Sequence, residues 1–433
     1  MNVCKDRAFE LLEKISFERI AGTDKELLCA HMLEEECIKA DVPVILEEFE
    51  ISKPDIFEAK LEVTQPEFCS IPCIALGRSG ETPDEGISAP LCYVENGSEL
   101  NMLDAKGKIV LLSGALKPEV RDNMMKAGAV GFIITFGSLF DPEEMIPQLR
   151  TRNVRKHPDD PFNLPGLMIH ITEAQKLLRM HPQEIRMVLK QDAKKMVKSH
   201  NVIATIEGTE KPEEIVTFSA HYDSVIYSAG AWDNGTGAMT IMELMHHFKA
   251  NPPKRTVKFI WCGAEEQGLL GSRAYCEIHE SELSTHLLDI NVDMTGVLLG
   301  YDTVICSCDE SVKTYIDFLA KLEGFPIQSS IDLHSSDSSA FANAGVPAVS
   351  FSRRSCSGGA EIHSRRDVMD YLDPDTFIRT VEFMVKFSDA VINAKVFPVP
   401  RELPEELQKK LVKFRKVRGI PEKTKDDVKK KMM

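Results

Sequence analysis

The sequence predicts an α/β protein with a mixed, largely parallel central sheet flanked by helices, and with a smaller domain inserted into it. From Asn201 to about residue 395, short apolar strands alternate with amphipathic helices, which is typical of a parallel sheet. Between about residues 66 and 195 this alternation of strands and helices is absent, and prolines and glycines are frequent. With 433 residues, 43% of them hydrophobic, the chain is long enough for two or three domains with large cores.

The first part of the chain predicts two helices followed by two strands. Residues 5–40 carry leucines and charges at helical spacing, interrupted at Ala21-Gly22-Thr23. Val44–Glu50 and Ala59–Thr64 have the composition of strands. We expect these elements to join the domain formed by the alternating part of the chain.

The inserted segment predicts short strands around a helix. Gly107–Leu112 and Ala129–Ile134 are predicted strands, with a helix at Glu119–Ala127 between them. A loop with five prolines follows at 137–165, and a helix at Thr172–Met180 closes the segment.

The alternating part of the chain supplies most of the predicted sheet. The predicted strands are Val202–Ile206, Ile215–Ala220, Val257–Trp261, Leu288–Asp293, Thr303–Cys306 and Ala348–Phe351. The predicted helices are Thr236–Phe248, Ser272–Glu280, Glu310–Glu323, Ser338–Ala344 and Pro374–Val391. Ligands bind beyond the carboxyl ends of the strands in such sheets, so polar residues at those ends are candidates for a functional site.

These predicted elements divide the chain into three parts. The predicted boundaries are 1–65 with 196–395 for a discontinuous larger domain, 66–195 for the inserted domain and 396–433 for a basic tail. From Arg401 onward the tail has twelve Lys/Arg against six Asp/Glu. We interpret it as a solvated helix with a frayed end, and contact with an acidic partner surface is the alternative.

Composition disfavours several classes of partner and location. The net charge of −15 argues against general binding to nucleic acid or to a membrane surface. The most apolar stretch, Ala127–Phe140, is too short and too rich in glycine to span a membrane. Residues 1–7 mix charges and lack a signal-peptide pattern. The eleven scattered cysteines are then expected to be free thiols in the cytoplasm, and neither Cys69/Cys73 nor Cys306/Cys308 has the second pair of a structural zinc site.

Five short segments, which we call stations, place acidic residues or histidines after predicted strands. They are Ser219–Asp223, Ala231–Gly237, Glu265-Glu266, Asn291–Met294 and Glu361–Asp367. Taken singly, each has a plain structural interpretation. His221 with Asp223 can be a hydrogen-bonded strand end, Asp233 resembles a helix N-cap, and the glutamate pair resembles an exposed turn.

Taken together, the stations predict a catalytic metal site. Histidine nitrogen and carboxylate oxygen without cysteine suit catalytic rather than structural zinc. Five such groups suit two metals about 3.5–4 Å apart that share one carboxylate, which leaves a sixth carboxylate as a base. In an extended chain Glu265 and Glu266 point to opposite faces, so one can bind metal while the other addresses a water. Asp223, two residues from His221, can fix the tautomer of that histidine.

On these motifs, in this order, the chain resembles the co-catalytic zinc peptidases, which include bacterial leucyl aminopeptidases, glutamate carboxypeptidase and the catalytically silent transferrin receptor. The resemblance covers residues 5–65 and 200–395 and implies a zinc-peptidase fold with two zinc ions, for which cobalt or manganese can substitute. It implies one metal held by His221, Asp233 and Asp293, a second held by Asp233, Glu266 and His363, Glu265 as general base, and Asp223 behind His221.

Residues 106–111 and 126–134 resemble the protease-associated domain that such enzymes often carry, which borders the active-site mouth and does no chemistry. The chain also departs from the family. Ser336-Asp337-Ser338 lacks the histidine of a Ser-Asp-His motif, which affects a substrate-side contact but no metal ligand. Arg353 and Arg354 are interpreted as surface residues, and the alternative is that they bind a substrate carboxylate in the pocket.

The resemblance implies an aminopeptidase that acts on peptide substrates. A carboxypeptidase or dipeptidase on the same scaffold is the first alternative. A non-catalytic binding protein is a weaker one because all five ligand positions and the base are present. A glutaminyl cyclase would need only one zinc. A homo-oligomer is compatible with the sequence but is not predicted by it.

Overall fold

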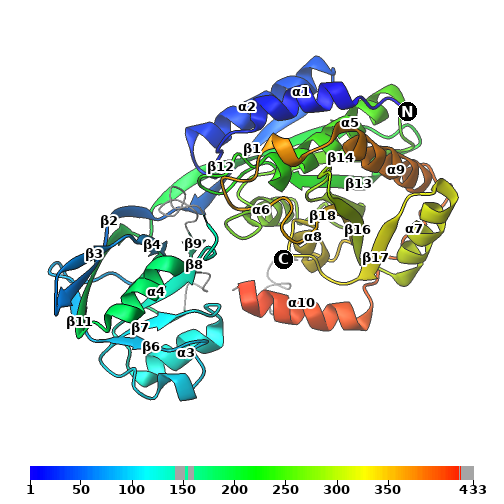
Figure 1. Ribbon diagram of the computed structural model, residues 1–433. Coiled ribbons are helices and arrows are strands. Elements are labelled where there is room, and N and C mark those ends of the chain that lie inside the picture. Colours follow the sequence, from blue (N-terminus) through cyan, green and yellow to red (C-terminus); the bar gives the residue numbers. More distant parts are fainter. Residues whose placement is uncertain (142–151, 155–159, 419, 421–433) are drawn as a thin grey trace. The chain divides into compact units, whose positions relative to one another are not determined.

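The computed structural model (Figure 1) describes residues 1–141, 152–154, 160–418 and 420. The chain divides into two units, each with its own core. The larger unit comprises Met1–Ile51 and Val197–Val412, and the smaller unit comprises Ser52–Met196 and Lys413–Met433. Within the described residues, no helix is both long enough and apolar enough to cross a membrane.

The larger unit is built on an eight-stranded sheet with the order β1-β12-β14-β13-β15-β18-β16-β17. The strands are β1 (Val44–Ser52), β12 (Met196–Ile206), β13 (Lys211–His221), β14 (Arg255–Cys262), β15 (His286–Val292), β16 (Gly300–Ser307), β17 (Ile327–Ile331) and β18 (Ala348–Ser355). Strands β14, β13, β15 and β18 are parallel neighbours, and β17 is parallel to β16. Strand β12 is antiparallel to β14, and β16 is antiparallel to β18. The predicted α/β class with a mixed, largely parallel sheet is confirmed.

Helices cover both faces of this sheet (Figure 1). They are α1 (Lys5–Ile15), α2 (Asp24–Lys39), α5 (Gly237–Ala250), α6 (Leu270–Ile278), α7 (Glu310–Glu323), α8 (Ser338–Asn343) and α9 (Pro374–Ile392), with the short segments η3 (Ala231–Thr236) and η4 (Met369–Tyr371). Helix α10 (Glu405–Arg418) follows in the basic tail. Helix α5 packs on β13, β14 and β15 beside α1 and α9. Helices α6 and α8 pack together on the opposite face.

The apolar run of β14 follows from this two-sided cover. Phe259 and Trp261 lie in the core under α5, whereas Ile260 and Cys262 lie in the core under α6. Successive strand residues point to opposite faces, so a strand buried on both sides is apolar throughout. The Trp261 indole donates to the carbonyl of Ala238 at 2.9 Å, which ties α5 to the sheet.

Residues 16–23 separate the first two helices, and they include the predicted break at Ala21-Gly22-Thr23. Gly22 has φ +71°, and a Cβ there would lie 2.3 Å from Val197 Cγ2. Thr23 caps α2 by accepting a hydrogen bond from the Glu26 amide at 3.3 Å. The first helix already ends at Ile15, Gly22 allows the turn that follows it, and the threonine cap starts the second helix.

The smaller unit contains a six-stranded sheet, β6-β7-β8-β10-β4-β9, and a four-stranded sheet, β3-β2-β11-β5. The strands are β2 (Asp55–Gln65), β3 (Cys69–Ile71), β4 (Ile74–Gly77), β5 (Ile87–Ala89), β6 (Leu91–Tyr93), β7 (Ile109–Leu112), β8 (Gly131–Phe136), β9 (Arg152–Asn153), β10 (Gly166–His170) and β11 (Glu184–Asp192). The helical elements are η1 (Leu100–Met102), α3 (Pro118–Ala127) and α4 (Ile171–Met180). Residues of β7 alternate between two hydrophobic cores. One core lies between β7 and the four-stranded sheet, and the other lies between β7 and α3.

Two features differ from the sequence-based expectation. Residues 52–65 were assigned to the larger domain, but β2 pairs antiparallel with β11 in the smaller unit. Only Lys53-Pro54 separates β2 from β1, so composition gives no sign that the chain changes sheets. Helix α10 of the basic tail is not uniformly solvated, because Leu407 and Leu411 are buried.

The predicted proline loop at 137–165 contains the short strand β9, and its residues 142–151 and 155–159 lie outside the described residues. The predicted frayed end likewise lies outside them from residue 421 onward. All eleven cysteines are free thiols in the structure.

Candidate metal centre

Four neighbouring parallel strands bring the stations to one edge of the larger sheet. His221 is the last residue of β13, Glu265-Glu266 follow β14, Asp293 follows β15, His363 lies in the loop after β18, and Asp233 lies in η3 after β13. Because these strands are parallel, their carboxyl ends share one edge. Residues up to 142 positions apart in the chain, His221 and His363, therefore meet.

Two three-residue clusters form there. His221 Nε2 lies 3.2 Å from Asp233 Oδ1 and 3.7 Å from Asp293 Oδ1. His363 Nε2 lies 3.1 Å from Asp233 Oδ2 and 2.9 Å from Glu266 Oε1. Within each cluster, one ligand atom from each residue lies within 4.8 Å of the others. Asp233 belongs to both clusters and offers a different oxygen to each histidine.

The donors in these clusters fit metal ions. They are imidazole nitrogens and carboxylate oxygens, the set typical of catalytic zinc. Like-charged carboxylates crowded into a buried site need a cation nearby, because an uncompensated buried charge is costly. Within the described part of the chain, no cysteine belongs to a group of this kind.

The carboxylates strongly perturb both histidines. Burial lowers the pKa of His363, but Asp233 and Glu266 outweigh it and raise that pKa to about 10. Burial also opposes the charged form of His221, whose pKa Asp223, Asp233 and Asp293 nevertheless raise well above its usual value. Metal ions would compete with these protons, because neutral imidazole is the form that binds metal.

The Glu265 carboxyl has the environment of a proton-transfer group. Burial raises its pKa well above the ordinary range, and the negative charge of Glu266 adds to this against the opposing effect of His221. A raised pKa makes a carboxylate a stronger base, which suits it to proton transfer. The alternative of a solvated turn is therefore wrong for this pair, since both glutamates are partly buried among charged groups.

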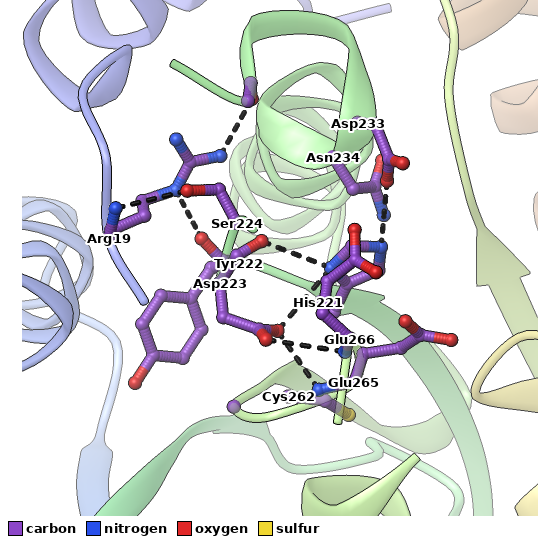
Figure 2. Close-up of polar contacts among 12 residues, drawn as sticks. Arg19, His221, Tyr222, Asp223, Ser224, Asp233, Asn234, Cys262, Glu265 and Glu266 are labelled. Carbon is purple, nitrogen blue, oxygen red and sulfur yellow. Dashed lines mark hydrogen bonds and ion pairs between the residues drawn. The ribbon is translucent and has the colours of Figure 1, made fainter. Parts of the chain in front are cut away.

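Asp223 connects the first histidine to the glutamate pair, as Figure 2 shows. Its fully buried carboxylate accepts from the amide of Glu265 at 3.0 Å through Oδ1, and from that of Glu266 at 3.3 Å through Oδ2. Asp223 Oδ1 also lies 3.4 Å from His221 Nδ1. One carboxylate thus orients the imidazole and holds the main chain of both glutamates.

Asn234 takes the helix-start role that the sequence offered as an alternative for Asp233. Its Oδ1 accepts from the amides of Gly237 at 3.0 Å and Met294 at 2.9 Å. Its Nδ2 donates to the carbonyl of Val292 at 2.9 Å. The Asp233 carboxylate is consequently free to face the two histidines.

Sequence reasoning gave no role to two buried residues next to the site. Asp367 accepts from the amides of Trp232 and Asp233, at 2.7 and 3.2 Å. Arg19 is fully buried and donates to main-chain carbonyls, including that of Gly230 at 2.7 Å. Asp367 lay in the fifth station, and its only signal was its spacing from His363. Nothing in the sequence around Arg19 indicates its role.

The interpretation of Arg353 as a surface residue is wrong, whereas Arg354 is exposed. Arg353 donates to Asp302 Oδ2 at 2.7 Å and to the carbonyls of Val297, Leu298 and Gly300. The alternative of a pocket arginine fails as well, because Nε, Nη1 and Nη2 all bind groups of the protein. Adjacent residues of β18 point to opposite faces of the sheet, which explains why Arg353 is buried and Arg354 is exposed.

Comparisons with known proteins agree with this geometry. Residues 201–388 match the model of peptidase family M28. The chain is 29% identical over 355 residues to aminopeptidase YwaD of Bacillus subtilis, an alignment covering 77% of this chain and 71% of that protein. It is 27% identical over 338 residues to carboxypeptidase Q of Pongo abelii, covering 73% and 70%. The structure of BSAP, a zinc aminopeptidase from Bacillus subtilis, aligns with a TM-score of 0.76 at 26% identity, over 93% of this chain and 98% of that chain.

Proposed function

We propose that this chain, whose residues 201–388 match the model of peptidase family M28, is a metal-dependent aminopeptidase that releases N-terminal residues from peptides by means of two zinc ions. One observation carries the proposal. The Asp233 carboxylate turns Oδ1 to His221 and Oδ2 to His363, the arrangement needed to bridge two ions. The similarity to YwaD and BSAP, both described as aminopeptidases, supports cleavage at the amino end of the peptide rather than at its carboxyl end.

The two clusters would each hold one ion. His221, Asp233 and Asp293 form the first site, and Asp233, Glu266 and His363 form the second. Zinc bound there supplies Lewis acidity, which polarises a carbonyl and brings the pKa of water to about 7. Cobalt and manganese accept the same donors, so metal analysis of the native protein decides the metal.

Glu265 is the proposed general base. Its carboxylate takes a proton from the attacking water and then delivers it to the leaving amine. Asp223 holds the Glu265 amide at 3.0 Å, so the position of this base is fixed through its main chain. The same carboxylate keeps His221 oriented, with Nε2 directed to the first site.

The substitution Glu265→Gln tests the assignment of the base. It keeps the shape of the side chain but removes proton transfer, so release of N-terminal residues should fall about 10²–10⁴-fold. Zinc content, measured by mass spectrometry, should stay at two ions per chain. Glu277→Gln on the exposed face of α6 is the matched control and should retain full activity. Near-full turnover by Glu265→Gln with both ions bound would show that another group is the base.

A carboxypeptidase is the second candidate, and the similarity to carboxypeptidase Q favours it. The same tripeptide, blocked by acetylation at its amino end or by amidation at its carboxyl end, separates the two activities. An aminopeptidase cleaves only the amidated peptide. Cleavage of only the acetylated peptide would overturn the choice of the amino end while leaving the exopeptidase class intact.

We propose further that the inserted segment 66–195 is a protease-associated-like domain without catalytic groups, and that the protein acts in the cytoplasm without a nucleic-acid partner. The motifs at 106–111 and 126–134, the free cysteines and the net charge of −15 support these points. Cell fractionation tests the location, and light scattering measures the oligomeric state. A loss of dipeptide turnover on replacing polar residues of the inserted segment would contradict its passive role.

A further inference from the structure

The loop that carries His363 also carries a buried carboxylate that binds the turn of Asp233. Asp367 is 1% exposed and lies four residues after His363. Its Oδ1 accepts from the Trp232 amide at 2.7 Å, and its Oδ2 accepts from the Asp233 amide at 3.2 Å and from Ser228 Oγ at 3.4 Å. Two segments that hold ligands of the second cluster are therefore joined through one side chain.

The other end of the same turn is anchored elsewhere. Asn234 binds the carbonyl of Val292 and the amide of Met294, the residues on either side of Asp293. Asp233 is thus held from two directions. Asn234 links the turn of Asp233 to the segment that contains Asp293, and Asp367 links the same turn to the loop that contains His363.

A carboxylate is needed at position 367 for a geometric reason. The amides of two consecutive residues point at it, and only a carboxylate presents two acceptor oxygens on one short side chain. Its burial near the like charge of Asp233 is unfavourable, and packing alone would favour a neutral residue. An asparagine would offer one acceptor oxygen and direct an NH₂ group at the second amide.

We propose that Asp367 is a positioning residue that sets the spacing between Asp233 and His363, and thereby the metal affinity of the Asp233–Glu266–His363 cluster. The inference rests on the proposed two-metal function. The cluster of His221, Asp233 and Asp293 depends on Asp367 much less, because Asn234 fixes its side of the turn.

Calorimetric titration of the chelator-treated full chain with Zn²⁺ tests the proposal without any measurement of activity. Groups that orient metal ligands typically change affinity about 10–100-fold when they are replaced. We expect Asp367→Asn to weaken one of two binding steps by that factor. In a His221→Gln background, which leaves the second cluster, Asp367→Asn should weaken the remaining step. In a His363→Gln background, which leaves the first cluster, it should change the remaining step less than about 3-fold.

Three results would overturn the proposal: equal loss of zinc affinity in both binding steps, no loss in either step, or a large further loss in the His363→Gln background. Asp309→Asn makes the same charge-removing change at the N-cap of α7, where one oxygen is left for the Ser311 amide, and as the matched control it should leave both steps unchanged. If Asp367→Asn fails to fold by circular dichroism, Asp367→Glu replaces it and should weaken the same step. A wild type that binds one ion overturns this inference together with the two-ion proposal, whereas two ions without peptidase activity overturn only the proposed function.

Discussion

Replacing Arg353 by methionine tests how the chain after Asp293 is held. The substitution removes hydrogen bonds to Asp302, to two carbonyls of the connection between β15 and β16, and to the carbonyl of Gly300 at the start of β16. Breaking a buried ion pair from one side costs about 3–5 kcal/mol. Asp302 keeps Thr380 at 3.0 Å and Arg379 at 3.3 Å, so we expect the lower end, about 3 kcal/mol. For a urea m-value of about 3 kcal/mol/M, the unfolding midpoint falls by about 1 M.

The assay is urea unfolding followed by circular dichroism, with Arg354→Met as the control. Arg354 is exposed, so its replacement should change the free energy of unfolding by less than about 0.5 kcal/mol. The KM for peptides with a free carboxylate should stay unchanged in Arg353→Met, because the Arg353 donors are bound internally. A midpoint shift below about 0.3 M, together with a raised KM for such peptides, would refute the structural role and restore the pocket interpretation.

Two further predictions concern the site and the core. Asp223→Asn leaves one acceptor oxygen for the amides of Glu265 and Glu266, so zinc affinity should fall about 10–100-fold in chelator competition, and an unchanged affinity would contradict its anchoring role. Burial lowers the pKa of His286 to about 3 from 6.5, so below pH 6.5 the unfolded chain takes up a proton that the folded chain does not. Stability from this group is present above pH 6.5 and is lost as pH falls, by about 2 kcal/mol at pH 5. His286→Gln should remove that part of the pH dependence, and parallel stability profiles of the two proteins would count against it.

Much of the larger sheet could be predicted because both its faces are covered. Strands such as β14 are then continuous apolar runs, which stand out in the sequence. Strand β17 was missed because it lies at the sheet edge and buries none of its residues fully. The sheet to which β2 belongs could not be predicted either, because pairing with β11 depends on a partner about 120 residues away.

The ligand types at the strand ends could be read from the sequence because their chemistry is unusual there. The residues that hold them could not, because Asp367 and Asn234 belong to types that also cap helices and turns at many surface positions. Their partners are backbone amides and carbonyls, which every residue carries. The arginine pair was misassigned because the predicted strand ended too early. It stopped at Phe351, whereas β18 runs to Ser355, so alternation was not applied to Arg353 and Arg354.

Asp223 and Asp367 perform the same task for different ligands of the centre. Each carboxylate accepts from two consecutive amides, those of Glu265 and Glu266 in one case and those of Trp232 and Asp233 in the other. The ligands Asp233 and Glu266 are thus placed through their main chain, so their side-chain oxygens stay available to a metal. This arrangement adds two negative charges to a site already rich in carboxylates, which bound cations would offset. Asp223 and Asp367 therefore fix the positions of the ligands and, through their negative charge, also make the binding of metal cations more favourable. An ordered site and a metal-bound site are then expected to stabilise each other.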